Sequence, residues 1–104
     1  MIDLEKNQFE KLIQEDRLNI VVFYRSECEV CDMLFEDFKK RNINNYYKAN
    51  INKDIIYYKT QLGIWTLPMT KIYLKGIVLW ERGGILYDKQ IKELFLVLNE
   101  GRLE

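Results

Sequence analysis

The only two cysteines of the chain, Cys28 and Cys31, flank Glu29 and Val30 in a C-x-x-C motif. The apolar run just before them predicts a buried strand over 19–24, and the residues from Cys28 onward predict a helix. Cys28 would then stand at a helix N-terminus, where free backbone N–H groups and the helix dipole favour a thiolate. A thiolate with a second thiol one turn away can attack a disulfide and then be resolved by its neighbour. The pair therefore predicts dithiol–disulfide exchange.

Three alternatives to redox chemistry stay open for the cysteine pair at this point. A structural zinc ion needs four ligands, and the chain has no histidine and no third cysteine, so a site of the usual Cys/His kind would need a second chain. An iron–sulfur cluster is limited in the same way. Two inert thiols in the core are the third alternative. The motif indicates redox chemistry mainly in a βαβ context, so that context has to be established.

Length and charge narrow the class of protein. The 104 residues predict a single domain over 1–104 with a core large enough to fold unaided. The 16 basic and 16 acidic residues cancel, so the net charge does not indicate a nucleic acid or an anionic membrane as partner. The N-terminus lacks the pattern of a secretory signal, and no run reaches the roughly 20 apolar residues of a membrane span. We therefore expect a cytoplasmic protein, where a cysteine pair is more often catalytic or metal-binding than a static brace.

Apolar periodicity predicts an alternation of strands and helices. Asn7 and Glu10 have the spacing of a capping box for the first helix, Gly63 would end a short third helix, and Asp88 is the expected N-cap of the last. The strands are expected at 19–24, 46–51, 69–75 and 77–82, and the helices at 7–16, 28–41, 54–62 and 88–100. A βαβ unit followed by a ββα unit predicts an α/β fold, with a mixed sheet of about four or five strands covered by helices on both faces.

At this level the chain resembles the thioredoxin-fold family, over about residues 9–98. The resemblance is carried by the strand–CxxC–helix, by Lys75-Gly76 closing a hairpin and by the loop 63–68, which ends in the only proline, Pro68. It implies that Cys28 is the nucleophile and Cys31 the resolving residue, with no bound cofactor required. It also implies disulfide-containing protein substrates and a partner reductase or a low-molecular-weight thiol as electron donor.

The resemblance also implies a substrate-binding surface. The family's cis-proline falls at Pro68, and the backbone of the preceding residue, Leu67, would pair with the substrate; a trans proline at a strand edge is the alternative. Gly84 falls where the family has a glycine facing the active site. Trp65 lies on the loop facing the cysteines, and with Leu67, Val30 and Gly84 it would form an apolar docking patch. Packing of Trp65 beneath its own loop is the alternative.

Two departures from the family pattern bear on activity. Thioredoxins carry Trp-Cys-Gly-Pro-Cys where this chain has Glu-Cys-Glu-Val-Cys over residues 27–31. The acids of this segment, with Asp32, should raise the thiol pKa, and Arg25 and the helix terminus should lower it. The family's buried aspartate falls at Val22 and its neighbouring lysine at Lys48, which would either stabilise a Cys31 thiolate or reach solvent.

We therefore expect a reductant whose resolution step is slower than that of a general thioredoxin. The alternative is a thioredoxin-fold binding or accessory module that docks one partner through the surface around Trp65 and Leu67, with weak or no redox turnover.

Overall fold

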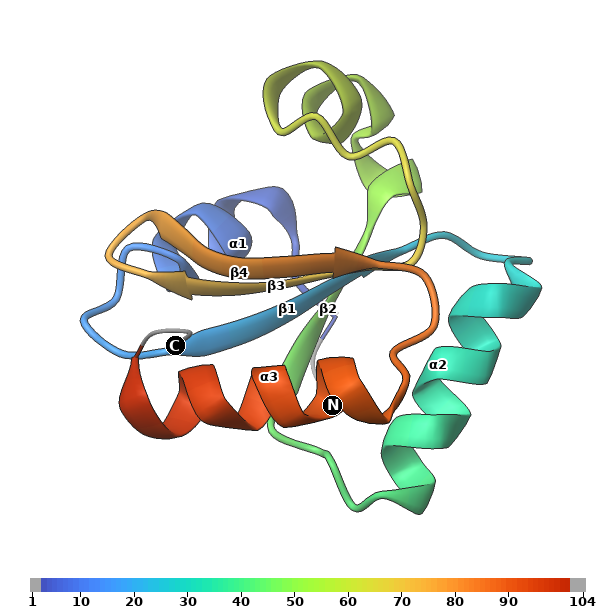
Figure 1. The fold of residues 1–104 in the computed structure, drawn as a ribbon. Coiled ribbons are helices and arrows are strands. Elements are labelled where there is room, and N and C mark those ends of the chain that lie inside the picture. The colour runs from blue at the N-terminus through green and yellow to red at the C-terminus, as the bar shows by residue number, and fades with distance from the viewer. Residues whose placement is uncertain (1–2, 102–104) are drawn as a thin grey trace.

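A mixed sheet of four strands forms the centre of the protein (Figure 1). The computed structural model describes residues 3–101. The strands are β1 (Asn19–Tyr24), β2 (Tyr46–Asn50), β3 (Met69–Leu74) and β4 (Ile77–Gly83), in the spatial order β2-β1-β3-β4. β1 is parallel to β2 and antiparallel to β3, and β3 and β4 form an antiparallel hairpin. The strands match the predicted ones to within about a residue at each end.

Helices cover both faces of the sheet (Figure 1), which confirms the predicted fold class. α1 (Lys6–Leu12) and the segment 51–64 lie on one face, and α2 (Glu29–Lys40) and α3 (Asp88–Glu100) lie on the other. Successive residues of β1 serve the two faces in turn, because side chains alternate along a strand. One core joins the sheet to α2 and α3 and includes Ile20, Val22, Leu34, Phe38, Ile72 and Leu94. The other includes Phe9, Val21, Phe23, Tyr58 and Tyr73.

The first helix begins and ends earlier than the capping pattern predicts. The backbone N–H of Glu5 donates to Oε1 of Gln8 at 2.8 Å, so Glu5 is the N-cap and the Asn7/Glu10 pattern is not used. The helix ends at Leu12 rather than near residue 16. The cause is tertiary, because the carbonyl of Ile13 accepts a 2.6 Å hydrogen bond from the N–H of Gly76 in the β3–β4 turn.

Two later segments also differ from the prediction. In place of an α-helix over 54–62, a 3₁₀ turn, η1 (Ile51–Lys53), is followed by a π-helical turn, η2 (Tyr57–Gln61), which Gly63 ends with φ +67°. The N-cap of α3 is Tyr87, whose N–H donates to Oε1 of Gln90 at 3.1 Å. Asp88, the predicted N-cap, is instead the first residue of the helix and pairs with Arg41 at the end of α2, at 2.9 Å.

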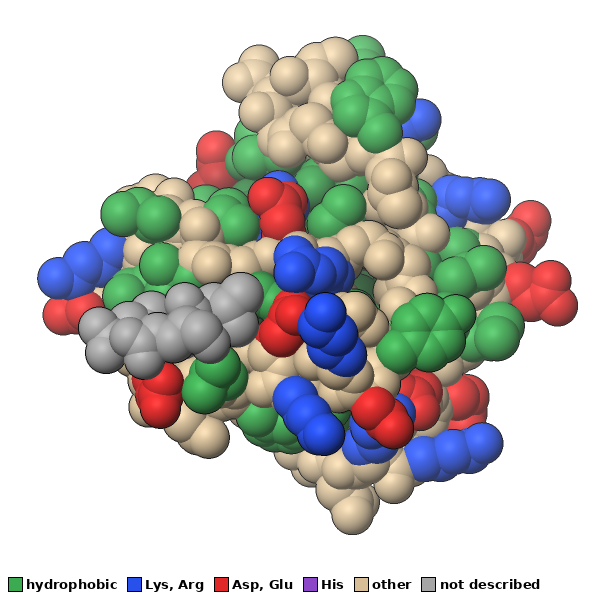
Figure 2. All heavy atoms as spheres, in the orientation of Figure 1, with side chains coloured by type: hydrophobic (Ala, Val, Ile, Leu, Met, Phe, Trp, Pro, Cys, Tyr) green, Lys and Arg blue, Asp and Glu red, His purple; other side chains and the backbone are tan. Residues whose placement is uncertain are grey.

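The surface carries both signs of charge in mixture. Figure 2 shows basic and acidic side chains interspersed over the face of the molecule that α3 covers. None of the helices within residues 3–101 has the length and apolar character needed to cross a membrane.

Candidate active site

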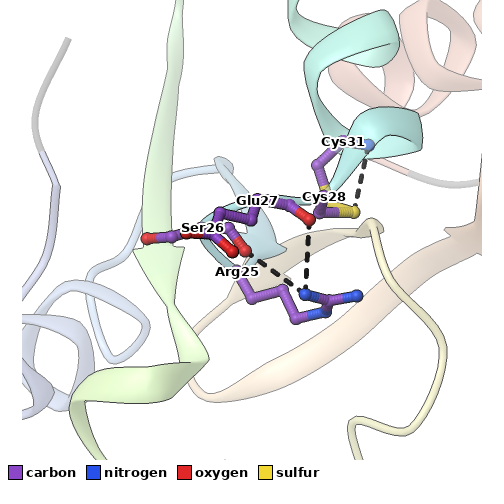
Figure 3. Close-up of a disulfide and its surroundings, with 5 residues drawn as sticks. All are labelled: Arg25, Ser26, Glu27, Cys28 and Cys31. Atoms are coloured by element: carbon purple, nitrogen blue, oxygen red, sulfur yellow. Dashed lines mark hydrogen bonds between the residues drawn. A yellow bond between two sulfur atoms is a disulfide. The ribbon is translucent and has the colours of Figure 1, made fainter.

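The two cysteines lie at the N-terminal end of α2 and are joined by a disulfide (Figure 3). Cys28 is the N-cap, with extended backbone, and its Sγ accepts a 3.2 Å hydrogen bond from the N–H of Cys31. Such a cap satisfies one of the N–H groups that have no partner within the helix, and it places the sulfur at the positive end of the helix dipole. Cys28 keeps 7% of its surface exposed, whereas Cys31 keeps 0%. A disulfide in solution can therefore reach Cys28 and not Cys31.

The loop between β1 and α2 is held by Arg25. Its Nη1 donates to the carbonyl oxygens of Ser26 and Glu27, at 3.3 and 3.4 Å, and Figure 3 shows the side chain folded back toward these groups. Glu27 has φ +57°, in the left-handed region. Nδ2 of Asn50 donates to Oγ of Ser26 at 3.2 Å, which fastens the loop to the end of β2. Arg25 thus positions the loop and brings a positive charge close to Cys28.

A cleft of about 400 Å³ opens beside Cys28. Its charged side chains are Arg25, Glu29 and Lys59. Its apolar lining comes from the first turn of α2, from the segment 51–64 and from the loop that follows: Val30, Ile51, Ile55, Ile64, Trp65 and Leu67. The structure therefore brings three members of the predicted docking patch, Val30, Trp65 and Leu67, to one cleft with Cys28.

Trp65 is 70% exposed, so it does not pack beneath its own loop. The ammonium of Lys59 lies 5.2 Å from the centre of its ring, within the range of a cation–π contact. Gly84, the fourth predicted member of the patch, does not line the cleft. Its N–H instead donates to the carbonyl of Pro68 at 2.7 Å, which links the end of β4 to the start of β3. The Leu67–Pro68 bond is cis, and the proline is buried.

A row of four residues crosses the sheet below α2 and α3. Val22 on β1 stands beside Lys48 on β2 and Thr70 on β3, and Thr70 stands beside Arg82 on β4. The ammonium of Lys48 lies 4.2 Å from the ring centre of Phe35 on α2, where a cation–π contact holds it. Nη2 of Arg82 lies 3.0 Å from Oε1 of Glu93 on α3. The two outer members therefore carry charge, and Val22 and Thr70 lie between them, both fully buried.

Thr70 is a residue that sequence reasoning passed over. It is 0% exposed, and its hydroxyl has no hydrogen-bond partner among the described residues. The only signal in the sequence is a threonine two places after Pro68 in a strand-forming run. Thr70 faces the side of the sheet that α2 covers because it is paired with Val22. The sequence pattern does not specify this pairing.

Within the described residues, no group of three or more histidine, cysteine, aspartate or glutamate side chains is arranged to hold a metal ion. The ligands that a zinc or iron–sulfur site would take from this chain are the two cysteines alone.

Comparisons with known proteins find likeness in structure and not in sequence. No protein-family model matches the chain, and no curated protein matches it. Thioredoxin from Trypanosoma brucei brucei superposes with a TM-score of 0.79 at 18% identity, over 96% of this chain and 92% of that one. Thioredoxin f2 of Chlamydomonas reinhardtii gives 0.75 at 22% identity, over 96% of both chains. Thioredoxin from Malassezia sympodialis gives 0.74 at 17% identity, over 96% and 90%. The chain therefore has the thioredoxin fold, with a CxxC pair at the start of α2.

Proposed function

We propose that the protein is a thiol–disulfide oxidoreductase that reduces protein disulfides through Cys28 and Cys31. One observation carries the proposal: Cys28 is slightly exposed on a cleft at the head of α2, and Cys31 lies fully buried one turn further along the helix. An accessible first thiol and a protected second one are what a two-step exchange needs, since only the first must meet the substrate.

In the proposed reaction the Cys28 thiolate attacks one sulfur of the substrate disulfide. A bond from Cys28 Sγ to that sulfur forms, the substrate S–S bond breaks, and the other substrate sulfur leaves as a thiolate that takes up a proton. Cys31 then gives up its proton and attacks Cys28 Sγ, which forms the internal disulfide and releases the second substrate thiol. The substrate gains two electrons and two protons. The internal disulfide between Cys28 and Cys31 is then reduced again by a partner reductase or a low-molecular-weight thiol.

The cleft is the proposed place for the substrate segment beside the disulfide. The backbone of Leu67 would pair with it, and Trp65 and Val30 would cover its apolar side chains. Glu27, Glu29 and Asp32 are exposed around the cysteines, and their charge opposes a thiolate. This supports the role of a reductant rather than that of a strong oxidant.

A trapping experiment tests the proposal. Cys31→Ser should accumulate mixed disulfides with several cell proteins, because the first step occurs and the second does not. Cys28→Ser/Cys31→Ser is the matched control and should trap none. The reduction potential of the pair, measured against a graded dithiol buffer, should show one two-electron transition near or below the cytosolic poise. No covalent capture, together with a pair that reacts only after unfolding, would contradict the proposal.

The exposure of Trp65 favours a second candidate, a binding module that docks one partner at the cleft. Capture of a single protein by wild type and by Cys28→Ser alike would support the module in place of the oxidoreductase.

A further inference from the structure

The buried hydroxyl of Thr70 is the feature that the proposed reaction leaves unexplained. A hydroxyl without a hydrogen-bond partner in the interior is unfavourable, and valine has nearly the same shape without that disadvantage. In its row of the sheet Thr70 lies between the apolar Val22 and Arg82, and Ile72 is the next residue of β3 on the same face. While the Cys28–Cys31 disulfide is formed, the Thr70 hydroxyl is a donor without an acceptor among the described residues. It is therefore available to an acceptor that appears only when the disulfide is reduced.

Cys31 lies on the buried face of α2, which packs against the same side of the sheet as Thr70. Residues opposite each other in an antiparallel pair share a face, so Thr70 points to the same side of the sheet as Val22. Cys31 belongs to the buried face of α2, with Leu34 and Phe38, and these two pack against Val22 in one core.

The first turns of α2 lie above this same row of the sheet. Phe35, one turn after Cys31, contacts the ring of Tyr24 at 5.4 Å between centres and the ammonium of Lys48 at 4.2 Å. Lys48 stands beside Val22, and Val22 beside Thr70. Thr70 also comes only two residues after the buried Pro68, at the cysteine end of β3.

We propose that in the reduced protein the Thr70 hydroxyl donates a hydrogen bond to Sγ of Cys31, directly or across one water, and thereby stabilises its thiolate. This inference rests on the proposed function and assigns Thr70 as a positioning residue for the resolving step. In that step Cys31 Sγ bonds to Cys28 Sγ, the bond from Cys28 to the substrate breaks, and the Cys31 proton ends on the departing substrate thiol. Thr70 keeps its own proton, so it acts as a donor and not as a base.

Other charged groups surround this part of the core, and all of them stay in place in the variants below. Lys48 lies over Phe35, and Arg82 is paired with Glu93. The remaining charges near the cysteines are on the loop, on the first turn of α2 and on η2: Arg25, Glu27, Glu29, Asp32 and Lys59. Because Thr70→Val alters none of them, a change in the titration of Cys31 reports the hydroxyl.

The test separates the two steps in time. Reduced protein is mixed with a limiting amount of the chromogenic disulfide dithiobis(nitrobenzoate). Attack by Cys28 releases the first coloured thiolate, and resolution by Cys31 releases the second. In Thr70→Val we expect the pKa governing the second phase to rise by about one unit. The second phase should slow about threefold below that pKa, since tenfold less thiolate is offset by about threefold greater nucleophilicity. The first phase should stay unchanged.

Thr70→Ser is the matched control, because it keeps the hydroxyl and should keep the wild-type pH profile of the second phase. The inference is overturned if Thr70→Val and wild type show the same profile, or if Thr70→Ser shifts as much as Thr70→Val.

A second measurement does not depend on turnover. Thiolate absorbance titrates Cys31 in Cys28→Ser, with and without Thr70→Val, and the added substitution should raise the pKa of Cys31 by a similar amount. Equal pKa values would overturn the role of Thr70. If wild type itself releases no second thiolate, the proposed function fails, and the titration in Cys28→Ser still decides whether Thr70 serves Cys31.

Discussion

The ammonium nitrogen of Lys59 lies 5.2 Å from the centre of the Trp65 ring, and both residues line the cleft beside Cys28. Lys59 belongs to the π-helical turn η2, and Trp65 to the loop that follows it. The contact leaves a large aromatic surface exposed to solvent in the cleft that Cys28 also lines. An exposed indole so placed is the side chain of this cleft with the most apolar area to offer a substrate.

Trp65→Ala should therefore weaken substrate binding without weakening the fold. We expect KM for a protein disulfide to rise about three- to tenfold with kcat little changed, which corresponds to roughly 0.7–1.4 kcal/mol of binding. The free energy of unfolding should change by less than about 0.5 kcal/mol, as for most surface positions. Ile77→Ala is the control, since Ile77 is 62% exposed and begins β4 at the β3–β4 turn. Figure 1 shows this turn at the opposite end of the sheet from the start of α2. An equal effect of both substitutions on KM would contradict a role for Trp65.

Val22→Asp should destabilise the protein because the carboxylate would be buried. Val22 is 0% exposed, and Lys48 beside it compensates only in part, since its ammonium is held over Phe35. We expect a loss of about 2–4 kcal/mol in the free energy of unfolding at neutral pH, measured by urea titration.

The loss of stability in Val22→Asp should depend on pH in a definite direction. Burial would raise the carboxyl pKa in the folded state, so the substitution costs least stability at low pH, where the carboxyl group is protonated. The loss of unfolding free energy then grows as pH rises from the unfolded-state pKa through the raised, folded-state pKa. Val22→Asn, uncharged at every pH, is the control and should show no such trend. A constant loss in Val22→Asp between about pH 4 and pH 7 would show that the carboxylate is not desolvated.

Tyr58→Phe should leave the protein equally stable or more stable, by up to about 1 kcal/mol. Tyr58 is fully buried against Phe9 and Phe23, and within residues 3–101 its hydroxyl has no hydrogen-bond partner. Burial raises the pKa of Tyr58 from 10.0 to about 12. The neutral form is therefore favoured in the folded state, and the stability that it contributes is lost as pH rises from about 10 to about 12.

Denaturant titrations between about pH 10 and about pH 12 measure this loss of stability. Wild type should lose more stability than Tyr58→Phe, because phenylalanine has no group to ionise. Tyr87→Phe, at a position 70% exposed, should follow wild type. A marked loss of stability in Tyr58→Phe at neutral pH would mean that the hydroxyl has a partner in solution.

Asp88→Asn should weaken the junction between α2 and α3. The hydrogen bond from Arg41 and its positive charge hold the pKa of Asp88 below its usual value of 3.8. A lowered pKa means that the stabilising effect is present above that usual value and is lost as pH falls through the lower, folded-state pKa. Asp88→Asn should therefore be less stable than wild type at neutral pH, and the difference should vanish in strong acid. It should also shrink at high salt, and a difference that persists under both conditions would show that the effect does not come from the charge of Asp88.

The sequence predicted the elements whose local signals are strong. β1 is apolar at nearly every position and fully buried over most of its length, and Lys75 and Gly76 both take the positive φ values that a tight hairpin turn requires. The end of α1 was beyond prediction, because it depends on a hydrogen bond from Gly76, a residue distant in the chain. The spacing of a capping box fitted both Asn7/Glu10 and Glu5/Gln8, and spacing alone did not separate them.

The site was predicted in the same uneven way. Cys28, Trp65 and Leu67 meet at one cleft as expected, because a strand, a helix and a loop of known order place them there. Gly84 was expected in the patch and lies instead behind Pro68, since its N–H is bound to the proline carbonyl. Thr70 was missed because its position opposite Val22 depends on the register between β1 and β3, two strands that are not consecutive in the chain.

The atom that caps α2 is also the proposed nucleophile. As long as Cys28 Sγ accepts the N–H of Cys31, that sulfur closes the end of the first turn of the helix. Every change in the bonding of that sulfur, from thiolate to mixed disulfide to internal disulfide, alters the acceptor strength felt by one backbone amide. The amide of Cys31 is thus a built-in spectroscopic reporter, whose nuclear magnetic resonance shift and exchange rate would follow the catalytic cycle without any attached label.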